Sequence, residues 1–274
     1  MMPSEGEAGS KSFGAFSGVF VPTFLSIMGV IFFLRLGYVV GVGGVAGSIL
    51  IILLSVSVTF ATGLSLSSIT TNIKIGAGGA YSIISKTLGL EIGGSVGVPL
   101  FLAQAFSVAL YIFGFAEAWV FVFPEHPFLP VALAVFGLLF LLVFVSTKLA
   151  VRAQTVVFVV VCASLVSVFL GGSLLDIGRE ALTTPLFGAF AEMDFWSLFA
   201  LFFPAVTGLM AGIGMSGELS NPKRQIPKGV LSGLGVTTVL YVLLVLWFGY
   251  SASPAELIEN PLLVVDLSAF APAV

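Results

Sequence analysis

Charged residues are scarce in this sequence. Only 8% of its 274 residues are Asp, Glu, Lys or Arg, against about 25% in an average soluble domain. Hydrophobic residues make up 58%, and the mean hydropathy is +1.19. This composition excludes an ordinary soluble domain and indicates an integral membrane protein. The net charge of −3, with dispersed basic residues, also excludes the basic footprint of a nucleic-acid-binding protein.

Residues that commonly serve catalysis or cofactor binding are also few. The only cysteine, Cys162, rules out an intrachain disulfide, and the only histidine, His126, stands alone in a PEHP turn. The glycine-rich string GAGGAY at 76–81 lacks the lysine and hydroxyl of a phosphate-binding loop. We expect a tight cytoplasmic connection there. The N-terminal MMPSEGEAGSKS does not resemble a cleavable signal peptide. We therefore expect neither an enzyme nor a cofactor.

Long apolar runs are abundant and predict membrane-spanning helices. A helix of about 20 apolar residues can cross a hydrocarbon core ~30 Å thick, and no alternating strands of a membrane barrel are visible. The fold class is therefore all-α, with an N-terminal cytoplasmic tail (1–16), a membrane domain (17–250) and an external C-terminal segment (251–274). The seven predicted spans are approximately 17–41, 45–68, 93–122, 128–147, 153–171, 196–217 and 229–250.

Basic residues favour one orientation of these spans. If the spans alternate, one side receives Arg179, Arg35 lies within the first span, and the remaining basic residues share the other side. These are Lys11, Lys74, Lys86, Lys148, Arg152, Lys223, Arg224 and Lys228. By the positive-inside rule the N-terminus is cytoplasmic and Val274 is external. We expect a multi-pass protein of the cell membrane.

Two of the predicted spans are interrupted at their middles by glycine and proline. They are residues 18–41, GVFVPTFLSIMGVIFFLRLGYVVG, and residues 199–217, FALFFPAVTGLMAGIGMSG. Backbone groups freed at membrane depth persist only where they are buried in protein or line a polar cavity. The breaks lie five spans apart, which is typical of an inverted-repeat transporter whose broken helices meet at the midplane. The second repeat stops after two spans, so we expect a fragment or a naturally shortened relative.

The freed backbone groups predict ion binding at each break. In the first, Pro22 and Gly29 loosen the helix, which frees carbonyls at 25–28 and amides at 29–31. In the second, Pro204 and Gly208 act in the same way, and Thr207 adds a hydroxyl. Carbonyls are ligands for alkali cations, and amides at a helix N-terminus attract anions.

A plainer interpretation stays open for each of these residues. Proline or glycine in a membrane helix is commonly a kink or a packing contact, and Thr207 can bond the carbonyl one turn back. Tyr111 can be a packing aromatic whose hydroxyl finds any neighbour. Arg35, at membrane depth, either snorkels outward or pairs with an acid. The string NPKRQIPKG at 221–229 is expected to be a cytoplasmic loop before the last span.

Three long strings, in this order, resemble the cation-chloride cotransporters. They are IMGVIFFLRLGYVVG, then GAGGAYSIISKTLGLEIGGSVG followed by SVALYIFGFAE, then FFPAVTGLMAGIGMSGELSNPKRQIPKG. The resemblance covers most of residues 17–250. It implies a partial LeuT-like inverted repeat of the amino acid, polyamine and organocation superfamily, with discontinuous helices 1 and 6. The sequence looks like a prokaryotic member, because the long cytoplasmic termini of eukaryotic relatives are missing.

The resemblance also implies ion ligands. Potassium would contact Ser26, Ile27, Tyr111, Pro204 and Thr207. One chloride would lie at Gly29, Val30 and Ile31, and another at Gly208, Leu209 and Met210. Leu25 and Met28 stand at sodium-ligand positions, but the other sodium ligands, and a tyrosine of the second chloride site, belong to helices that this sequence lacks. Ser26 replaces a common asparagine and Met28 a common aromatic residue, so sodium use stays open.

We therefore expect an electroneutral symporter of potassium and chloride, with sodium use left open, that works by alternating access in a lipid bilayer. Two alternatives stay open. One is an amino-acid or polyamine transporter of the same superfamily, and the other is a shortened membrane subunit that does not transport. Its protein partner is also left open: the chain either forms a homodimer with a second copy of itself or pairs with a missing C-terminal half.

Overall fold

The computed structural model describes residues 13–73, 78–171 and 182–269, without the side chains of Val30, Ile31, Thr147 and Lys148. Every named element in these ranges is helical, and one isolated bridge joins Phe13 to Leu219. Six helices of the described residues are long and apolar enough to cross a membrane: Phe32–Asn72, Leu90–Val122, Phe128–Val145, Leu149–Leu170, Phe195–Glu218 and Pro222–Ser251. The chain is therefore an all-helical, multi-pass membrane protein.

The first predicted break is present and is short. A π-helical turn, η1 (Phe16–Phe20), leads into α1 (Val21–Ile27), and α2 (Val30–Asn72) follows. Between them, Met28 (φ −82°, ψ 43°) and Gly29 (φ −92°, ψ −158°) leave the helical conformation. Pro22 is the second residue of α1, which continues directly from the helical turn η1. Helix α1 ends at Ile27, five residues after this proline.

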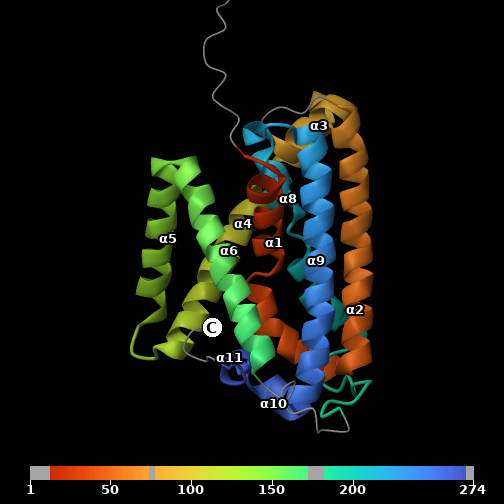
Figure 1. Cartoon of the computed structure of the whole chain (residues 1–274), viewed down its shortest axis with the longest axis vertical. Helices are drawn as coiled ribbons and strands as arrows, with labels where there is room; N and C mark the ends of the chain where they lie inside the picture. Colours follow the sequence, from red (N-terminus) through yellow and green to blue (C-terminus); the bar gives the residue numbers. More distant parts are fainter. Residues whose placement is uncertain (1–12, 74–77, 172–181, 270–274) are drawn as a thin grey trace, which may run out of the picture.

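Helix α2 contains the boundary between the first two predicted spans. Gly44 has φ 70° and ψ 176° inside it, and Figure 1 shows that the part of α2 after this bend runs along the height of the molecule. The loop around Pro185 covers the bend, with Val45 N donating to Pro185 O at 3.1 Å. A Cβ on Gly44 would lie 2.8 Å from Pro185 O. Both the positive φ and this contact require glycine.

The connection predicted from GAGGAY is instead partly helical, so that prediction was wrong for residues 79–81. They begin helix α3 (Gly79–Leu88), which is bounded by Gly78 (φ 109°) and Gly89 (φ 95°). Residues 76–77 lie outside the described ranges. The chain continues through α4 (Leu90–Val122), α5 (Phe128–Val145) and α6 (Thr147–Leu170), with α5 at the edge of the molecule (Figure 1).

The second predicted break is also present. Helix α7 (Phe195–Phe202) passes into the 3-10 turn η3 (Phe203–Val206), and α8 (Leu209–Gly214) and η4 (Met215–Glu218) follow. Thr207 and Gly208 lie between η3 and α8 in no regular helix. The interruption therefore coincides with the proline, threonine and glycine of the predicted break.

Residues 221–229 form the start of a helix and not the predicted loop. Helix α9 runs over Pro222–Ser251, with Asn221 as its N-cap residue. Pro222 fits because the first residues of a helix need no amide donor. Pro227, inside α9, has no amide hydrogen. The only helical hydrogen bond that is lost is therefore the one it would donate to a carbonyl in the first turn of α9. Two short helices, α10 (Pro254–Glu259) and α11 (Leu263–Asp266), lie beyond α9.

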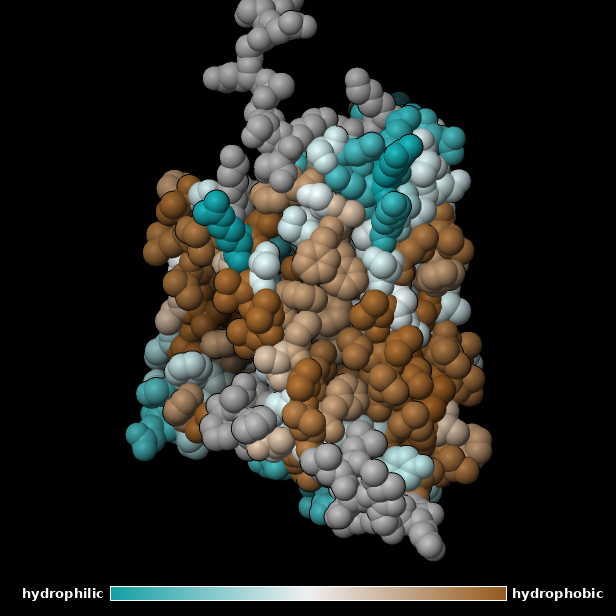
Figure 2. All heavy atoms as spheres, viewed as in Figure 1, coloured by the Kyte–Doolittle hydropathy of each residue, from teal (hydrophilic) through white to brown (hydrophobic). Residues whose placement is uncertain are grey.

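The core lies where α2 packs against α9 and α7, and where α1 packs against α8 and α9. Glycines allow this approach, since a Cβ on Gly233 of α9 would lie 3.0 Å from Thr23 Cγ2 of α1. By contrast, α4 and α5 expose large apolar side chains, such as Phe106 (72%) and Phe144 (78%). Figure 2 shows apolar side chains over the middle of one face and hydrophilic ones toward its ends. This distribution fits a chain surrounded by hydrocarbon at mid-height.

Candidate functional site

The two breaks lie side by side, although about 180 residues separate them in the sequence. A Cβ on Gly208 would lie 2.8 Å from Ser26 Cβ and 2.9 Å from Ile27 N. Gly208 has φ −69° and ψ 3°, a conformation that other residues adopt. Position 208 therefore requires glycine because of the close contact between the two breaks, and not because of its backbone conformation.

Tyr111 of α4 closes one side of the first break. Its hydroxyl donates to Ser26 O at 3.1 Å and lies 3.3 Å from Ser26 Oγ. A Cβ on Gly29 would lie 3.0 Å from Cε1 of the Tyr111 ring. The structure thus brings together three of the predicted ligand positions, Ser26, Gly29 and Tyr111. The ring of Tyr111 packs against Gly29, which also bears out the plainer interpretation that Tyr111 is a packing aromatic.

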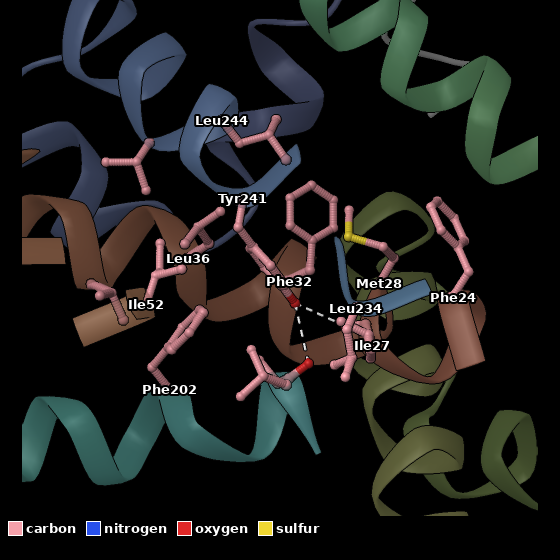
Figure 3. Packing of buried hydrophobic residues seen from close by; sticks show 14 of the residues in the cluster. Phe24, Ile27, Met28, Phe32, Leu36, Ile52, Phe202, Leu234, Tyr241 and Leu244 are labelled. Atoms are coloured by element: carbon pink, nitrogen blue, oxygen red, sulfur yellow. Dashed lines mark hydrogen bonds between the residues drawn. The ribbon is translucent and has the colours of Figure 1, made fainter. Parts of the chain in front are cut away.

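A second tyrosine, which the sequence analysis missed, reaches the breaks from the opposite side. Tyr241 of α9 is fully buried, and its hydroxyl donates to Ile27 O at 2.8 Å and approaches Ala205 O at 3.4 Å (Figure 3). The available signal was a lone hydroxyl in the apolar string VLYVLLVLWF, because a buried tyrosine hydroxyl needs a partner. Only the packing identifies that partner.

Thr207 makes the local bond that the plainer interpretation foresaw. Its hydroxyl donates to Pro204 O at 2.8 Å, and its amide lies 3.3 Å from the same oxygen. Both residues are exposed in the described structure. This bond uses the hydroxyl hydrogen and leaves the lone pairs of Thr207 Oγ1 available to a cation.

A cavity of about 600 Å³ adjoins the first break. Leu25, Met28, Gly29 and Tyr111 line it together with apolar residues of α4 and α6. Met210, in contrast, lines a different cavity of about 350 Å³ beside Gln104 and the glycines around α3. The wall of the first cavity is mostly apolar, and Asp266 is its one acidic lining residue. An ion near the cavity would meet the oxygens and amides of the break and the carboxylate of Asp266.

The predicted anion positions lie at two helix starts. Helix α2 begins at Val30 and α8 at Leu209, which is 4% exposed. The first amides of a helix have no partner within that helix, and the helix dipole makes this end attractive to anions. Because α8 has only six residues, the longer α2 offers the stronger of the two dipoles.

Arg35 of α2 faces an acid on α4. Its Nη2 lies 3.9 Å from Oε1 of Glu117, and the two side chains are 40% and 50% exposed. The pairing interpretation of Arg35 is thus present as a long contact. An exposed pair of this kind contributes about 0–1 kcal/mol to stability.

Among the described residues, no group of three or more His, Cys, Asp or Glu side chains could hold a metal ion. His126 Nδ1 accepts a hydrogen bond from Trp119 Nε1 at 2.9 Å. This bond ties the histidine to a neighbouring ring.

The chain is similar in sequence to several known proteins. The chain is 35% identical to Solute carrier family 12 member 1 of Oryctolagus cuniculus over 87% of this chain and 24% of that protein. It is 36% identical to human Solute carrier family 12 member 2, over 85% and 21%. It is also 32% identical to Vacuolar cation-chloride cotransporter 1 of Saccharomyces cerevisiae, over 93% and 26%. The chain thus spans about a quarter of the length of these relatives.

A family model also matches the chain, over residues 18–255, a range that includes both breaks, Tyr111 and Tyr241. Its description is amino acid permease. This is a family of transporters and not of enzymes. The chain belongs to the amino acid permease family.

Proposed function

We propose that this chain is part of a symporter that couples potassium to chloride across the membrane by alternating access. The observation that carries the proposal is the meeting of the two breaks, with Gly208 against Ser26 and Ile27 and with Tyr111 bonded to Ser26 O. The similarity to a yeast protein named a cation-chloride cotransporter supports a cation together with chloride as the cargo.

The potassium site would use oxygens of both breaks. Its proposed ligands are Ser26, Ile27, Tyr111, Pro204 and Thr207, which supply carbonyl and hydroxyl oxygens. Tyr111 and Thr207 donate their hydrogens to carbonyls, so lone pairs of both hydroxyls remain free for a cation. Ser26 O and Ile27 O each accept one side-chain hydrogen bond and keep a second lone pair for a cation. Pro204 O accepts both the hydroxyl and the amide hydrogen of Thr207, so its use as a ligand requires the longer amide bond to give way.

Chloride would lie at the helix starts. One proposed site uses the amides of Gly29, Val30 and Ile31, and the other those of Gly208, Leu209 and Met210. Opposite unit charges about 4 Å apart attract by roughly 4 kcal/mol at an effective dielectric constant of 20. Potassium and chloride in adjoining sites would therefore favour joint occupancy, which is the physical basis of coupled transport. A sodium ion near Leu25 and Met28 is retained as an open part of the proposal.

Amino-acid transport is the second candidate. The match to the amino acid permease model favours it, and the cavity of about 600 Å³ beside Gly29 and Tyr111 is large enough for a small organic substrate. Apart from Asp266, its wall offers few partners for a substrate's charged groups, whereas the breaks supply oxygens and amides suited to inorganic ions. Uptake of labelled amino acids in the same vesicles separates the two candidates.

Rubidium uptake into proteoliposomes that contain the intact chain tests the proposal. We expect uptake that disappears when chloride is replaced by gluconate. We also expect higher half-saturation concentrations for rubidium in Tyr111→Phe and Thr207→Ala. Tyr81→Phe, on the surface of α3, is the matched control and should behave as the intact chain. Chloride-independent uptake, or unchanged rubidium saturation in both site variants, would refute the proposal.

A further inference from the structure

We propose that Tyr241 is a positioning residue that joins the two breaks from α9 and holds the Ile27 carbonyl toward the potassium site. The potassium part rests on the function proposed above, whereas the joining part rests on geometry alone. The hydroxyl lies 2.8 Å from Ile27 O and 3.4 Å from Ala205 O. One side chain of α9 thus reaches an oxygen of α1 and an oxygen of η3.

Both acceptors are carbonyls that the breaks leave without a regular helical partner. In a continuous helix Ile27 O would accept from the amide four residues ahead, but Met28 and Gly29 interrupt the helix first. Ala205 lies in η3, which ends at Val206 before the second break. Since Tyr241 is fully buried, its hydroxyl satisfies these oxygens where water has little access.

The ring of Tyr241 is fixed by aromatic neighbours on both sides. It packs edge-on against Phe32 of α2, with centroids 6.1 Å apart and planes at 72°. It packs in the same way against Phe202 of α7, at 5.3 Å and 80° (Figure 3). Phe32 follows the first break and Phe202 precedes the second. Phenylalanine at position 241 would keep this packing and remove only the hydroxyl.

Tyr241 and Tyr111 have different tasks in this arrangement. Tyr111 is 37% exposed, lines the cavity and bonds only to Ser26 of the first break. Tyr241 is buried and reaches both breaks. Its bond occupies one lone pair of Ile27 O and fixes the orientation of that carbonyl, so that the second lone pair stays directed for a cation.

Hydrogen exchange of the purified full chain tests the joining role without any transport assay. In Tyr241→Phe we expect faster amide exchange in peptides from both breaks, 28–32 and 207–211. In Tyr111→Phe we expect it in the first break only. Tyr250→Phe, the same substitution on the same helix, is the matched control. Exchange in Tyr241→Phe that equals this control at either break would overturn the inference.

Rubidium uptake tests the potassium part. The loss of one positioning hydrogen bond should raise the half-saturation concentration for rubidium about threefold to tenfold, with the maximal rate retained and chloride saturation less affected. A merely structural role would lower the maximal rate through loss of folded protein, and that result would overturn the potassium part. If the intact chain shows no chloride-dependent uptake, the proposed function fails, and the exchange experiment still decides the joining role.

Discussion

Replacing Gly208 by alanine should separate the two breaks. The new Cβ would lie 2.8 Å from Ser26 Cβ, 2.9 Å from Ile27 Cγ1 and 2.9 Å from Ile27 N. Carbon atoms in ordinary contact lie about 3.5–4.0 Å apart, so the breaks would have to move. Because one of the crowded atoms is a backbone nitrogen next to the proposed ligand Ile27 O, a side-chain rotation cannot remove the whole clash.

The size of the effect follows from two opposing terms. Overpacking of a well-packed interior costs about 1–3 kcal/mol. Alanine in place of glycine at a compatible φ of −69° returns about 0.4–1 kcal/mol by restricting the unfolded chain. The net loss of stability therefore lies between about 0 and 2.6 kcal/mol, with a central value of about 1.3 kcal/mol. For a chain of this size the central value should lower the Tm by about 3–5 °C.

The matched control is Gly214→Ala at the far end of α8, the helix that follows Gly208, because a Cβ on Gly214 would meet nothing within 4 Å. Thermal unfolding in detergent, followed by circular dichroism, should rank Gly208→Ala below the intact chain and Gly214→Ala close to it. Gly208→Ala should also lose rubidium uptake, because the displaced breaks no longer present their oxygens to one ion. Equal Tm values and equal uptake in both variants would refute the proposed contact between the breaks.

Two further predictions concern the ends of helices. Gly44→Ala should lower the free energy of unfolding by about 1–3 kcal/mol, because φ is 70° and the new Cβ would lie 2.8 Å from Pro185 O. The control in the same unfolding assay is Gly137→Ala, because a Cβ on Gly137 would have open space around it. At Asp194, hydrogen bonds from Ser197 lower the pKa of the carboxyl group. The ionised carboxylate therefore stabilises the folded chain fully above the ordinary pKa of about 3.9, and this stabilisation is lost as the pH falls through the lowered pKa. Asp194→Asn should therefore flatten the acid side of an unfolding titration, and an unchanged titration would contradict this assignment.

The breaks could be predicted because their causes are local. Proline has no amide hydrogen and glycine has no Cβ, so Pro22, Gly29, Pro204 and Gly208 mark places where a helix is weakened by its own residues. The structure confirms an interruption at both places. The local bond of Thr207 to Pro204 O was likewise foreseen, because threonine bonds back to its own helix without help from another segment.

Two polar strings were wrongly predicted to be connections between helices, because their composition is the same in a connection and in a helix start. Residues 79–81 and 221–229 contain glycine, proline or basic residues, which are typical of connections. In the structure they begin α3 and α9. A proline in the first turn of a helix and a glycine at its start are both tolerated. Composition alone therefore could not separate a loop from a helix start.

The sequence by itself determined that the chain lies in a membrane and where its two broken helices lie. Apolar runs with few charges require a membrane, and the proline and glycine residues at the middles of two of these runs weaken the helix there. Only the tertiary structure decided which groups meet at those breaks. Tyr241 lies 214 residues from Ile27, and neither residue carries a local sign of the other. Their bond depends on how α9 packs against α1, because a buried hydroxyl takes whichever carbonyl the packing leaves within reach.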